Sequence, residues 1–138
     1  PDRKRVLILC THNSARSQIA EGLLRHMAGD RFEAASAGTE QTGVHPLAIE
    51  VMNELGIDIS AHTSKKLDRF LRQRFDFVIT VCETAAESCP TFPGSTRRIP
   101  WTFPDASASI GADTARMEGF RNVRDEILDR LGIVTESA

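Results

Sequence analysis

The sequence predicts an α/β fold, a three-layer α/β/α arrangement around a central, mostly parallel four-stranded sheet. Two observations predict it. Short β-rich apolar runs alternate with segments whose apolar residues recur at helical spacing. Gly or Pro residues also stand where one kind of segment gives way to the next. Such alternation is typical of parallel strands joined by right-handed crossovers. The 138 residues suit one domain, residues 1–138.

Each element has a local reason. The predicted strands are four short apolar runs at residues 5–9, 32–37, 75–81 and 96–99, of which FDFVITV at 75–81 is the clearest. Amphipathic spacing predicts helices at residues 17–28, 45–55 and 113–131, a shorter one capped by Ser64, and one helical turn at residues 84–88. Four prolines mark the stretch between Cys89 and Asp113 as mostly loop.

Composition excludes several classes of partner. The formal net charge is -2 and hydrophobic residues make up 41%, so nothing suggests binding to nucleic acid or to an anionic membrane. No apolar run approaches the roughly 20 residues of a membrane helix. The basic N-terminus is followed by only a short apolar stretch without a cleavage site, which does not fit a signal peptide. We therefore expect a cytoplasmic protein, and a monomer.

The segment VLILCTHNSARSQIAEG, residues 6–22, carries the strongest chemical signal. Cys10 ends a buried strand and Arg16 precedes a helix, so loop amides and the positive helix end converge on one point. Such dipoles lower the pKa of a thiol, and a guanidinium offers paired donors to a tetrahedral oxyanion. The alternative is a buried strand-end cysteine beside a surface cation. The predicted oxyanion-binding loop comprises Thr11, His12, Asn13, Ser14, Ala15, Arg16 and Ser17.

Two of these loop residues have specific expectations. Asn13 is a residue type that tolerates the left-handed backbone conformation of a tightly curled loop. Ser14 and Ser17 can supply hydroxyl donors, and we expect Ser17 to be able to donate to the Cys10 thiolate.

Two further cysteines lie seven residues apart in VCETAAESCP. In a regular helix Cys82 and Cys89 would be about 10.5 Å apart along the axis, whereas a disulfide needs Cα atoms within about 7 Å. A bond between them therefore requires this segment to unwind. Cys82 follows a predicted strand of the same parallel sheet as Cys10, so both thiols should meet at one edge. Two unrelated thiols are the alternative interpretation. The odd number of cysteines argues against a structural disulfide framework.

These motifs resemble the low-molecular-weight phosphatase family and, within it, the thioredoxin-coupled arsenate reductases. The resemblance rests on CTHNSARSQIAEG, SAGT at 36–39, HPLAIEVMNELGID at 45–58, FDFVITVC ending at Cys82, the Cys89–Pro90 pair and the spacing of Trp101 and Asp105. It implies that Cys10 attacks arsenate, that Cys82 then attacks Cys10 as arsenite leaves, and that Cys89 moves the disulfide to Cys82–Cys89. It also implies thioredoxin as the reductant and no organic cofactor.

The resemblance assigns a further role to Asp105. In the phosphatases of the family an Asp at this position protonates the leaving group, and a similar task is implied here. The alternative is a turn residue after Pro104. The family usually has Pro after this Asp, and Ala106 in its place predicts a less rigid loop.

Some relatives bind potassium at the positions of Asn13, Glu21 and Ser36. A further carboxylate ligand lies in those relatives near the segment that reads Ser-Lys-Lys at residues 64–66 here. We therefore expect no potassium ion. Instead, the three residues should brace the loop through hydrogen bonds, and a lysine ammonium can take the cation's place.

Two alternative functions remain open at this point. A tyrosine phosphatase of the family would use only Cys10, Arg16 and Asp105, with no need for Cys82 and Cys89. Such phosphatases typically carry aromatic residues beside the Asp, whereas this chain has no Tyr and continues with Ala-Ser-Ala after Asp105. The shared loop still implies weak activity on aryl phosphates. A non-enzymatic module that binds oxyanions or senses oxidants is the third candidate.

Overall fold

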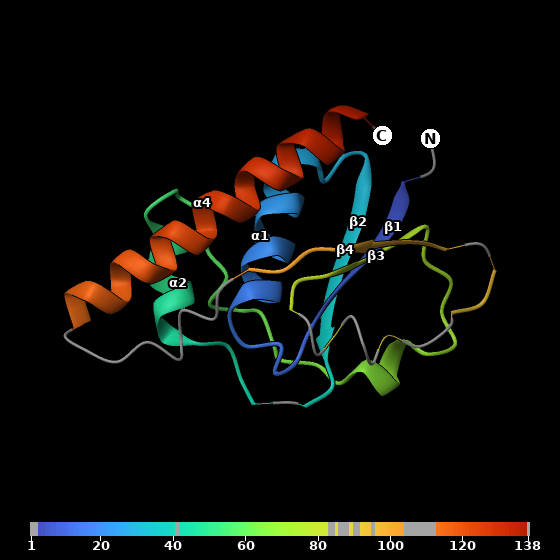
Figure 1. Cartoon of the computed structure of the whole chain (residues 1–138), viewed down its shortest axis with the longest axis horizontal. Coiled ribbons are helices and arrows are strands. Elements are labelled where there is room, and N and C mark those ends of the chain that lie inside the picture. Colours follow the sequence, from blue (N-terminus) through green and yellow to red (C-terminus); the bar gives the residue numbers. More distant parts are fainter. Residues whose placement is uncertain are drawn as a thin grey trace.

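The structure is a computed structural model that describes residues 3–40, 42–82, 85, 89, 92–94, 96–103 and 113–137 (Figure 1). The elements in chain order are β1 (Lys4–Cys10), α1 (Arg16–Ala28), β2 (Phe32–Gly38), α2 (Pro46–Asn53), the 3₁₀-helix η1 (Leu67–Phe70), β3 (Phe77–Thr80), β4 (Arg97–Pro100) and α4 (Asp113–Ser137). The predicted α/β fold with a central four-stranded sheet is confirmed. No helix in the described part of the chain is long and apolar enough to cross a membrane.

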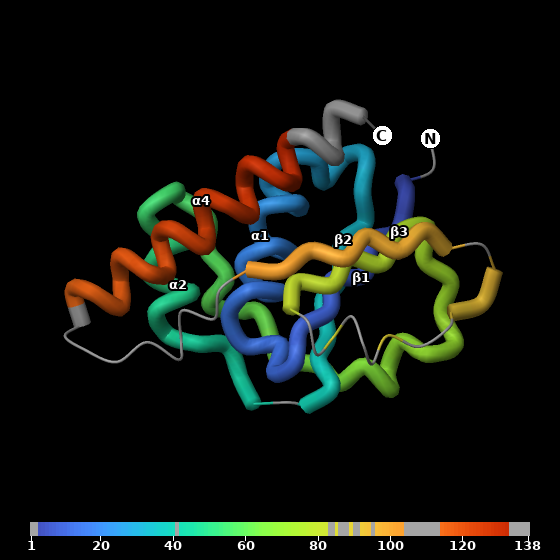
Figure 2. The backbone as a smooth tube through the Cα atoms, in the orientation of Figure 1, coloured from blue at the N-terminus to red at the C-terminus, as the bar shows by residue number. Residues whose placement is uncertain are grey.

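The sheet has the strand order β2-β1-β3-β4, and every neighbouring pair is parallel. β1 lies between β2 and β3 in the interior of the sheet (Figure 2). Its residues from Val6 to Cys10 are buried. A strand buried on both faces is expected to be continuously apolar, as VLILC is. Because β1 and β3 are parallel neighbours, their carboxyl ends meet at one edge of the sheet. That edge holds Cys10 and Cys82.

The helices α1, α2 and α4 contact one another, and α4 runs across the other two (Figure 1). The apolar spacing of α4 correctly predicts its inner face. Its fully covered side chains are Phe120, Val123, Ile127 and Leu131, with Met117 and Leu128 partly buried. On α1, Ile19, Leu23 and Leu24 are buried. These contacts hold α1 in place, and its first turn directly follows the loop that begins after Cys10.

The observed element ends differ from the predicted ones by a few residues. α2 begins at Pro46 because His45 is its N-cap, where Nδ1 accepts a hydrogen bond from Leu47 N at 3.1 Å. The predicted strand at 75–81 narrows to Phe77–Thr80, and α4 extends to Ser137. The predicted helical turn at 84–88 lies outside the described residues except for Ala85.

The predicted cap of the short helix is wrong. η1 begins at Leu67 with Lys66 in the cap position and no side-chain cap. Ser64 lies two residues earlier, and its Oγ donates to the carbonyl of His12 at 3.0 Å. A serine near a helix start can satisfy other backbone groups, and here the Cys10 loop claims it.

Glu54 joins α2 to α4. Its carboxylate accepts hydrogen bonds from Arg121 Nη2 at 2.7 Å and from Arg124 Nη1 at 2.8 Å. Arg124 Nη1 also donates to the carbonyl of Val51 at 2.8 Å. The hydrogen bonds from Arg121, and then those from Arg124, lower the pKa of Glu54 from 4.5 to about 2.

This lowered pKa predicts an acid-dependent stability contribution. A carboxylate with a lowered folded-state pKa stabilises the fold fully above its unfolded-state pKa, and the contribution is lost as the pH falls through about 2. We expect wild type to be more stable than Glu54→Gln at pH 6, with the difference shrinking below pH 4.5. Urea unfolding across pH 2–7 measures it. Glu118→Gln is the control, because Glu118 contacts Arg121 within α4 only. A difference that does not change with pH would contradict the assignment.

Candidate active site

The loop between Cys10 and Arg16 connects the end of β1 to the start of α1. Asn13 takes the left-handed conformation that the sequence predicts, with φ 51°. Ala15 occupies the N-cap position of α1, and no side chain caps this end. The first-turn amides of a helix lack partners within the helix, so an uncapped start that faces a loop favours an anion.

The backbone of the loop is oriented by its own carbonyls. Each carbonyl from Thr11 to Ala15 accepts a hydrogen bond of 2.8–3.2 Å; the donors are Glu40 N, Ser64 Oγ, Gln18 Nε2, His45 N and Ile19 N, in that order. The C=O and the following N–H of a trans peptide point in opposite directions. With the carbonyls held on the outside, the amides of residues 12–16 face inward. This arrangement can bind the oxygens of a tetrahedral oxyanion.

Asn13 is the central brace of the loop, and its side chain is fully buried. Its Nδ2 donates to Ser17 Oγ at 2.8 Å and to Ser36 Oγ at 2.9 Å. Its Oδ1 accepts from Lys65 N at 2.8 Å and from Gln18 Nε2 at 3.0 Å. All four hydrogen-bonding positions of the amide are therefore used, which holds Asn13 in its left-handed backbone conformation.

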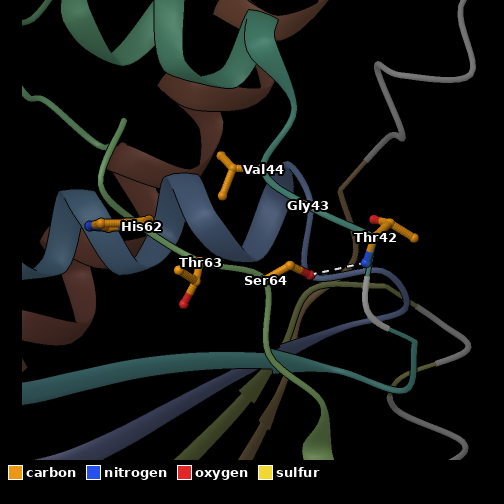
Figure 3. Close-up of a pocket in the computed structure, with 6 residues that line it drawn as sticks. All are labelled: Thr42, Gly43, Val44, His62, Thr63 and Ser64. Carbon is orange, nitrogen blue, oxygen red and sulfur yellow. Dashed lines mark hydrogen bonds between the residues drawn. The ribbon is translucent and has the colours of Figure 1, made fainter.

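Two neighbouring segments support the loop from the side. Residues 42–44 and 62–64 lie next to each other and line an open hollow of about 490 Å³ (Figure 3). Thr42 N donates to Ser64 Oγ at 3.2 Å, and Ser64 Oγ in turn donates to the carbonyl of His12. His12 itself is exposed and pairs with Glu40 at 2.8 Å. The hollow therefore borders the outer, carbonyl side of the loop.

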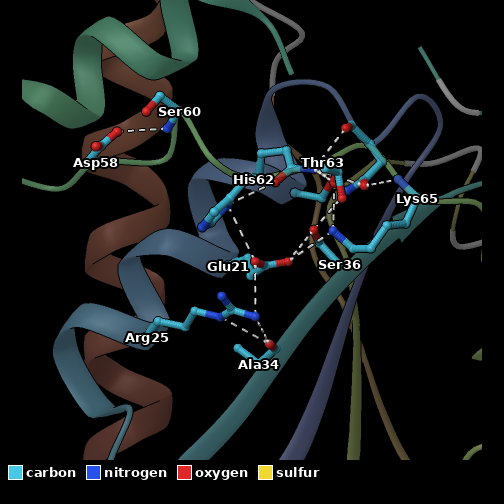
Figure 4. A network of polar contacts seen from close by, with 12 residues as sticks. Glu21, Arg25, Ala34, Ser36, Asp58, Ser60, His62, Thr63 and Lys65 are labelled. Atoms are coloured by element: carbon cyan, nitrogen blue, oxygen red, sulfur yellow. Dashed lines mark hydrogen bonds and ion pairs between the residues drawn. The ribbon is translucent and has the colours of Figure 1, made fainter. Parts of the chain in front are cut away.

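A second polar network surrounds Glu21, whose side chain is only 2% exposed (Figure 4). Ser36 Oγ donates to Glu21 Oε1 at 2.7 Å, and Lys65 Nζ lies 3.7 Å from the same oxygen. Arg25 and His62 each lie 3.4 Å from Oε2. Burial lowers the pKa of Lys65 and that of His62, and Glu21 opposes both shifts.

These contacts bear on whether Asn13, Glu21 and Ser36 could bind a potassium ion. The oxygens of Asn13, Ser36 and Glu21 are brought together, but each is already engaged by protein donors. A lysine ammonium also lies beside the carboxylate. The residues therefore do not fit a potassium site, and they brace the loop as expected. The described residues also contain no group of three or more His, Cys, Asp or Glu side chains suited to a metal.

The structure brings the first two thiols together. Cys10 and Cys82 are both buried, and their sulfur atoms are within hydrogen-bond reach of each other. Thr11 Oγ1 lies 3.4 Å from Cys82 Sγ. Ser17 Oγ accepts the hydrogen bond from Asn13 Nδ2, and the expected donation from Ser17 to Cys10 stays a prediction. Sequence reasoning missed the Thr11 contact, since nothing in the pattern showed which way this hydroxyl points.

The interaction between the two thiols shifts their pKa values in opposite directions. The hydrogen bond from Cys10, followed by those from Thr11 and the Ala85 amide, lowers the pKa of Cys82 to about 5 despite its burial. The hydrogen bond with Cys82 and then burial raise the pKa of Cys10, although Arg16 and the Thr11 amide act to lower it. The expected low pKa of Cys10 is thus not found in this state. The interaction of the two thiols instead favours ionisation of Cys82 over that of Cys10.

Of the remaining predicted site residues, the structure describes Arg16 and Cys89 but not Asp105. Arg16 Nη1 donates to the carbonyl of Phe103 at 3.0 Å, which ties the loop to the segment that leads toward Asp105. Asp105 itself lies outside the described residues. Cys89 is half-buried beside β3 and β4, and burial raises its pKa while Arg98 acts to lower it.

Comparisons with known proteins agree with this arrangement. The model of the low molecular weight phosphotyrosine protein phosphatase family matches residues 5–135. An arsenate reductase of Halalkalibacterium halodurans is 43% identical over 136 residues, which cover 99% of this chain and 98% of that protein. A solved arsenate reductase in a phosphate-binding state is 32% identical with a TM-score of 0.77, covering 97% of this chain and 98% of that one.

A thioredoxin-dependent arsenate reductase of Corynebacterium glutamicum is also similar in structure. It is 32% identical with a TM-score of 0.72, and the match covers 99% of this chain and 64% of that chain. The match of the family model to residues 5–135 and the 43% identity are decisive. The chain therefore belongs to the low molecular weight phosphotyrosine protein phosphatase family and, within it, to the group of the arsenate reductases.

Proposed function

We propose that the chain reduces arsenate to arsenite through successive reactions of Cys10, Cys82 and Cys89, and that thioredoxin reduces the final disulfide. The observation that carries the proposal is the interaction of the Cys10 and Cys82 thiols at the sheet edge where the predicted oxyanion-binding loop begins. A phosphatase needs only the first thiol. A second, activated thiol beside it is what a reduction requires, because two electrons must leave sulfur.

The loop would bind arsenate through its inward amides and the Arg16 guanidinium. Arsenate is a tetrahedral oxyanion, and these donors match its shape and charge. The phosphate-binding state of the similar arsenate reductase supports this part of the proposal. Asp105 follows in sequence the segment that Arg16 holds, and we assign it to assist the departing oxygen.

The chemical steps conserve atoms and electrons. Cys10 Sγ attacks arsenic, an As–S bond forms, and one oxygen departs as water with the proton that Cys10 had held. The Cys82 thiolate then attacks Cys10 Sγ, so that the Cys10–Cys82 disulfide forms as the As–S bond breaks. The electron pair of the broken bond stays on arsenic, which leaves as arsenite. The low pKa of Cys82 keeps it ionised for this attack.

Cys89 completes the cycle within the protein. Its thiolate attacks Cys82 Sγ, the Cys82–Cys89 disulfide forms, and Cys10 leaves as a thiolate. An external dithiol then reduces the new disulfide. The thioredoxin-dependent relative supports thioredoxin as that dithiol.

The test is arsenate-dependent oxidation of NADPH in the presence of thioredoxin and thioredoxin reductase. We expect steady turnover by wild type and near-complete loss in Cys89→Ser, which can complete only the first disulfide. Glutathione with glutaredoxin in place of thioredoxin should support little turnover. Sustained turnover by Cys89→Ser would refute the last step, because thioredoxin would then have to reduce the Cys10–Cys82 disulfide directly.

The Glu21 network also makes a prediction about potassium. Because Lys65 supplies a positive charge beside the buried carboxylate, we expect the same kcat and KM for arsenate in potassium and in sodium buffers of equal ionic strength. Choline chloride gives a third, bulkier cation as a control for ionic strength. A rise in kcat/KM that is specific to potassium would contradict the assignment of Lys65.

A further inference from the structure

A small cavity beside Cys89 has no part in the steps above. It has a volume of about 210 Å³ and is lined by Thr80, Cys89, Arg98, Ile99 and Pro100. Thr80 ends β3, and the other strand residues belong to β4, the edge strand of the sheet. Most of this lining is apolar in character, yet it contains a thiol, a hydroxyl and a guanidinium.

Thr80 marks the cavity as a polar site. Its side chain is 4% exposed, and within the described part of the chain its Oγ1 has no hydrogen-bond partner. Buried hydroxyls nearly always have a partner, and an exception calls for an explanation. The residue that carries this hydroxyl lines the cavity together with Cys89.

Arg98 brings a positive charge to the same cavity. Within the described part of the chain, Arg98 is the charged residue among those that line the cavity with Cys89. The residue that β3 contributes, Thr80, is neutral. Burial raises the pKa of Cys89, whereas Arg98 lowers it. Since thiolates and not thiols attack disulfides, a charge at this place controls how much of Cys89 can react.

We propose that Arg98 is a positioning residue that stabilises the Cys89 thiolate in this cavity, and so sets the rate at which the disulfide passes from Cys10–Cys82 to Cys82–Cys89. The proposal rests on the proposed function. In the step concerned, the Cys89 proton goes to water, the Cys82–Cys89 bond forms and Cys10 leaves as a thiolate. No external oxidant or reductant takes part.

The strand supplies a matched control. Successive residues of a strand point to opposite faces, and Arg97 pairs with Phe77 in the register while Arg98 pairs with Val78. Arg97→Gln therefore removes the same charge from the same strand on the other face. Arg97 does not line the cavity.

The first experiment measures Cys89 alone. In a Cys10→Ser/Cys82→Ser chain, the rate of alkylation by iodoacetamide across pH 6–10 reports the apparent pKa of Cys89. We expect Arg98→Gln to raise this pKa by about half a unit and to slow alkylation at pH 7 about threefold, a modest effect because Arg98 is exposed. Arg98→Lys should keep most of the wild-type value, and Arg97→Gln all of it. An unchanged pKa in Arg98→Gln would overturn the proposal.

A second experiment follows the exchange in the three-cysteine chain. After one turnover with arsenate and no reductant, acid quenching and mass spectrometry separate the two disulfide species. Arg98→Gln should accumulate Cys10–Cys82, and this accumulation should fade at higher pH. Equal rates in Arg98→Gln and Arg97→Gln would refute the role of Arg98. The alkylation measurement needs neither arsenate nor thioredoxin, so a failure of the arsenate mechanism would not change it.

Discussion

Cys82→Ser should lose arsenate reduction by about a thousandfold or more while it keeps hydrolysis of p-nitrophenyl phosphate. The reason is geometric. Cys82 contacts Cys10 from the end of a neighbouring strand. The loop proposed to bind the oxyanion is held through its carbonyls by donors other than Cys82. Removing it withdraws the second electron-donating thiol and leaves the oxyanion site in place. The coupled NADPH assay and the release of p-nitrophenol measure the two activities on one preparation.

Cys10→Ser is the matched control for this prediction. It should abolish both activities, because both require the nucleophile at the floor of the loop. If Cys82→Ser reduced arsenate at the wild-type rate, the thiol relay would be refuted. If it lost both activities while still folded, its effect on the loop would outweigh its proposed chemical role.

Gly38→Ala should destabilise the protein by about 3 kcal/mol and reduce arsenate turnover at least about a hundredfold. Gly38 pairs with Cys10 in the register of β1 and β2. A Cβ at this position would lie 2.6 Å from the carbonyl oxygen of Thr11 and 2.7 Å from the amide nitrogen of Asn13. Both are backbone atoms of the oxyanion loop, so relief of the clash must move the loop itself. Urea unfolding and the coupled assay measure the two effects.

Gly132→Ala makes the same chemical change in a place with room. A Cβ there meets nothing within 4 Å, and the position lies within α4. We expect this variant to be more stable than wild type by about 0.5–1 kcal/mol, because alanine favours helix over glycine, with unchanged turnover. Wild-type activity in Gly38→Ala would contradict the close approach of β2 to the loop.

The sequence was sufficient for the parts of the fold that depend on local pattern. The run VLILC predicts a central strand because both of its faces are covered, and the apolar spacing of α4 predicts its buried face. The left-handed conformation of Asn13 is also predictable, since few residue types accept it in a curled loop. Parallel topology then places Cys82 at the edge that holds Cys10. These inferences need only periodicity, conformational preference and chain connectivity.

Other features depend on contacts between distant segments, and the sequence did not reveal them. Ser64 is spaced like a helix cap, but its hydroxyl serves His12, 52 residues earlier in the chain. The Cys10–Cys82 proton distribution was also not predicted. The helix start and Arg16 favour a Cys10 thiolate, but the contact with Thr11 and the Ala85 amide favours the charge on Cys82. Such a balance depends on distances that only the folded chain defines.

The opposite pKa shifts of the two thiols have an electrostatic consequence for the proposed encounter with arsenate. Near neutral pH arsenate arrives with one or two negative charges, and two adjacent thiolates would repel it strongly at short range. Because the interaction of the two thiols disfavours ionisation of both, an incoming arsenate ion would meet one anionic sulfur and one guanidinium rather than two thiolates. In the proposed first step the Cys10 proton leaves with the expelled oxygen, so Cys82 can stay a thiolate until it attacks Cys10 in the second step.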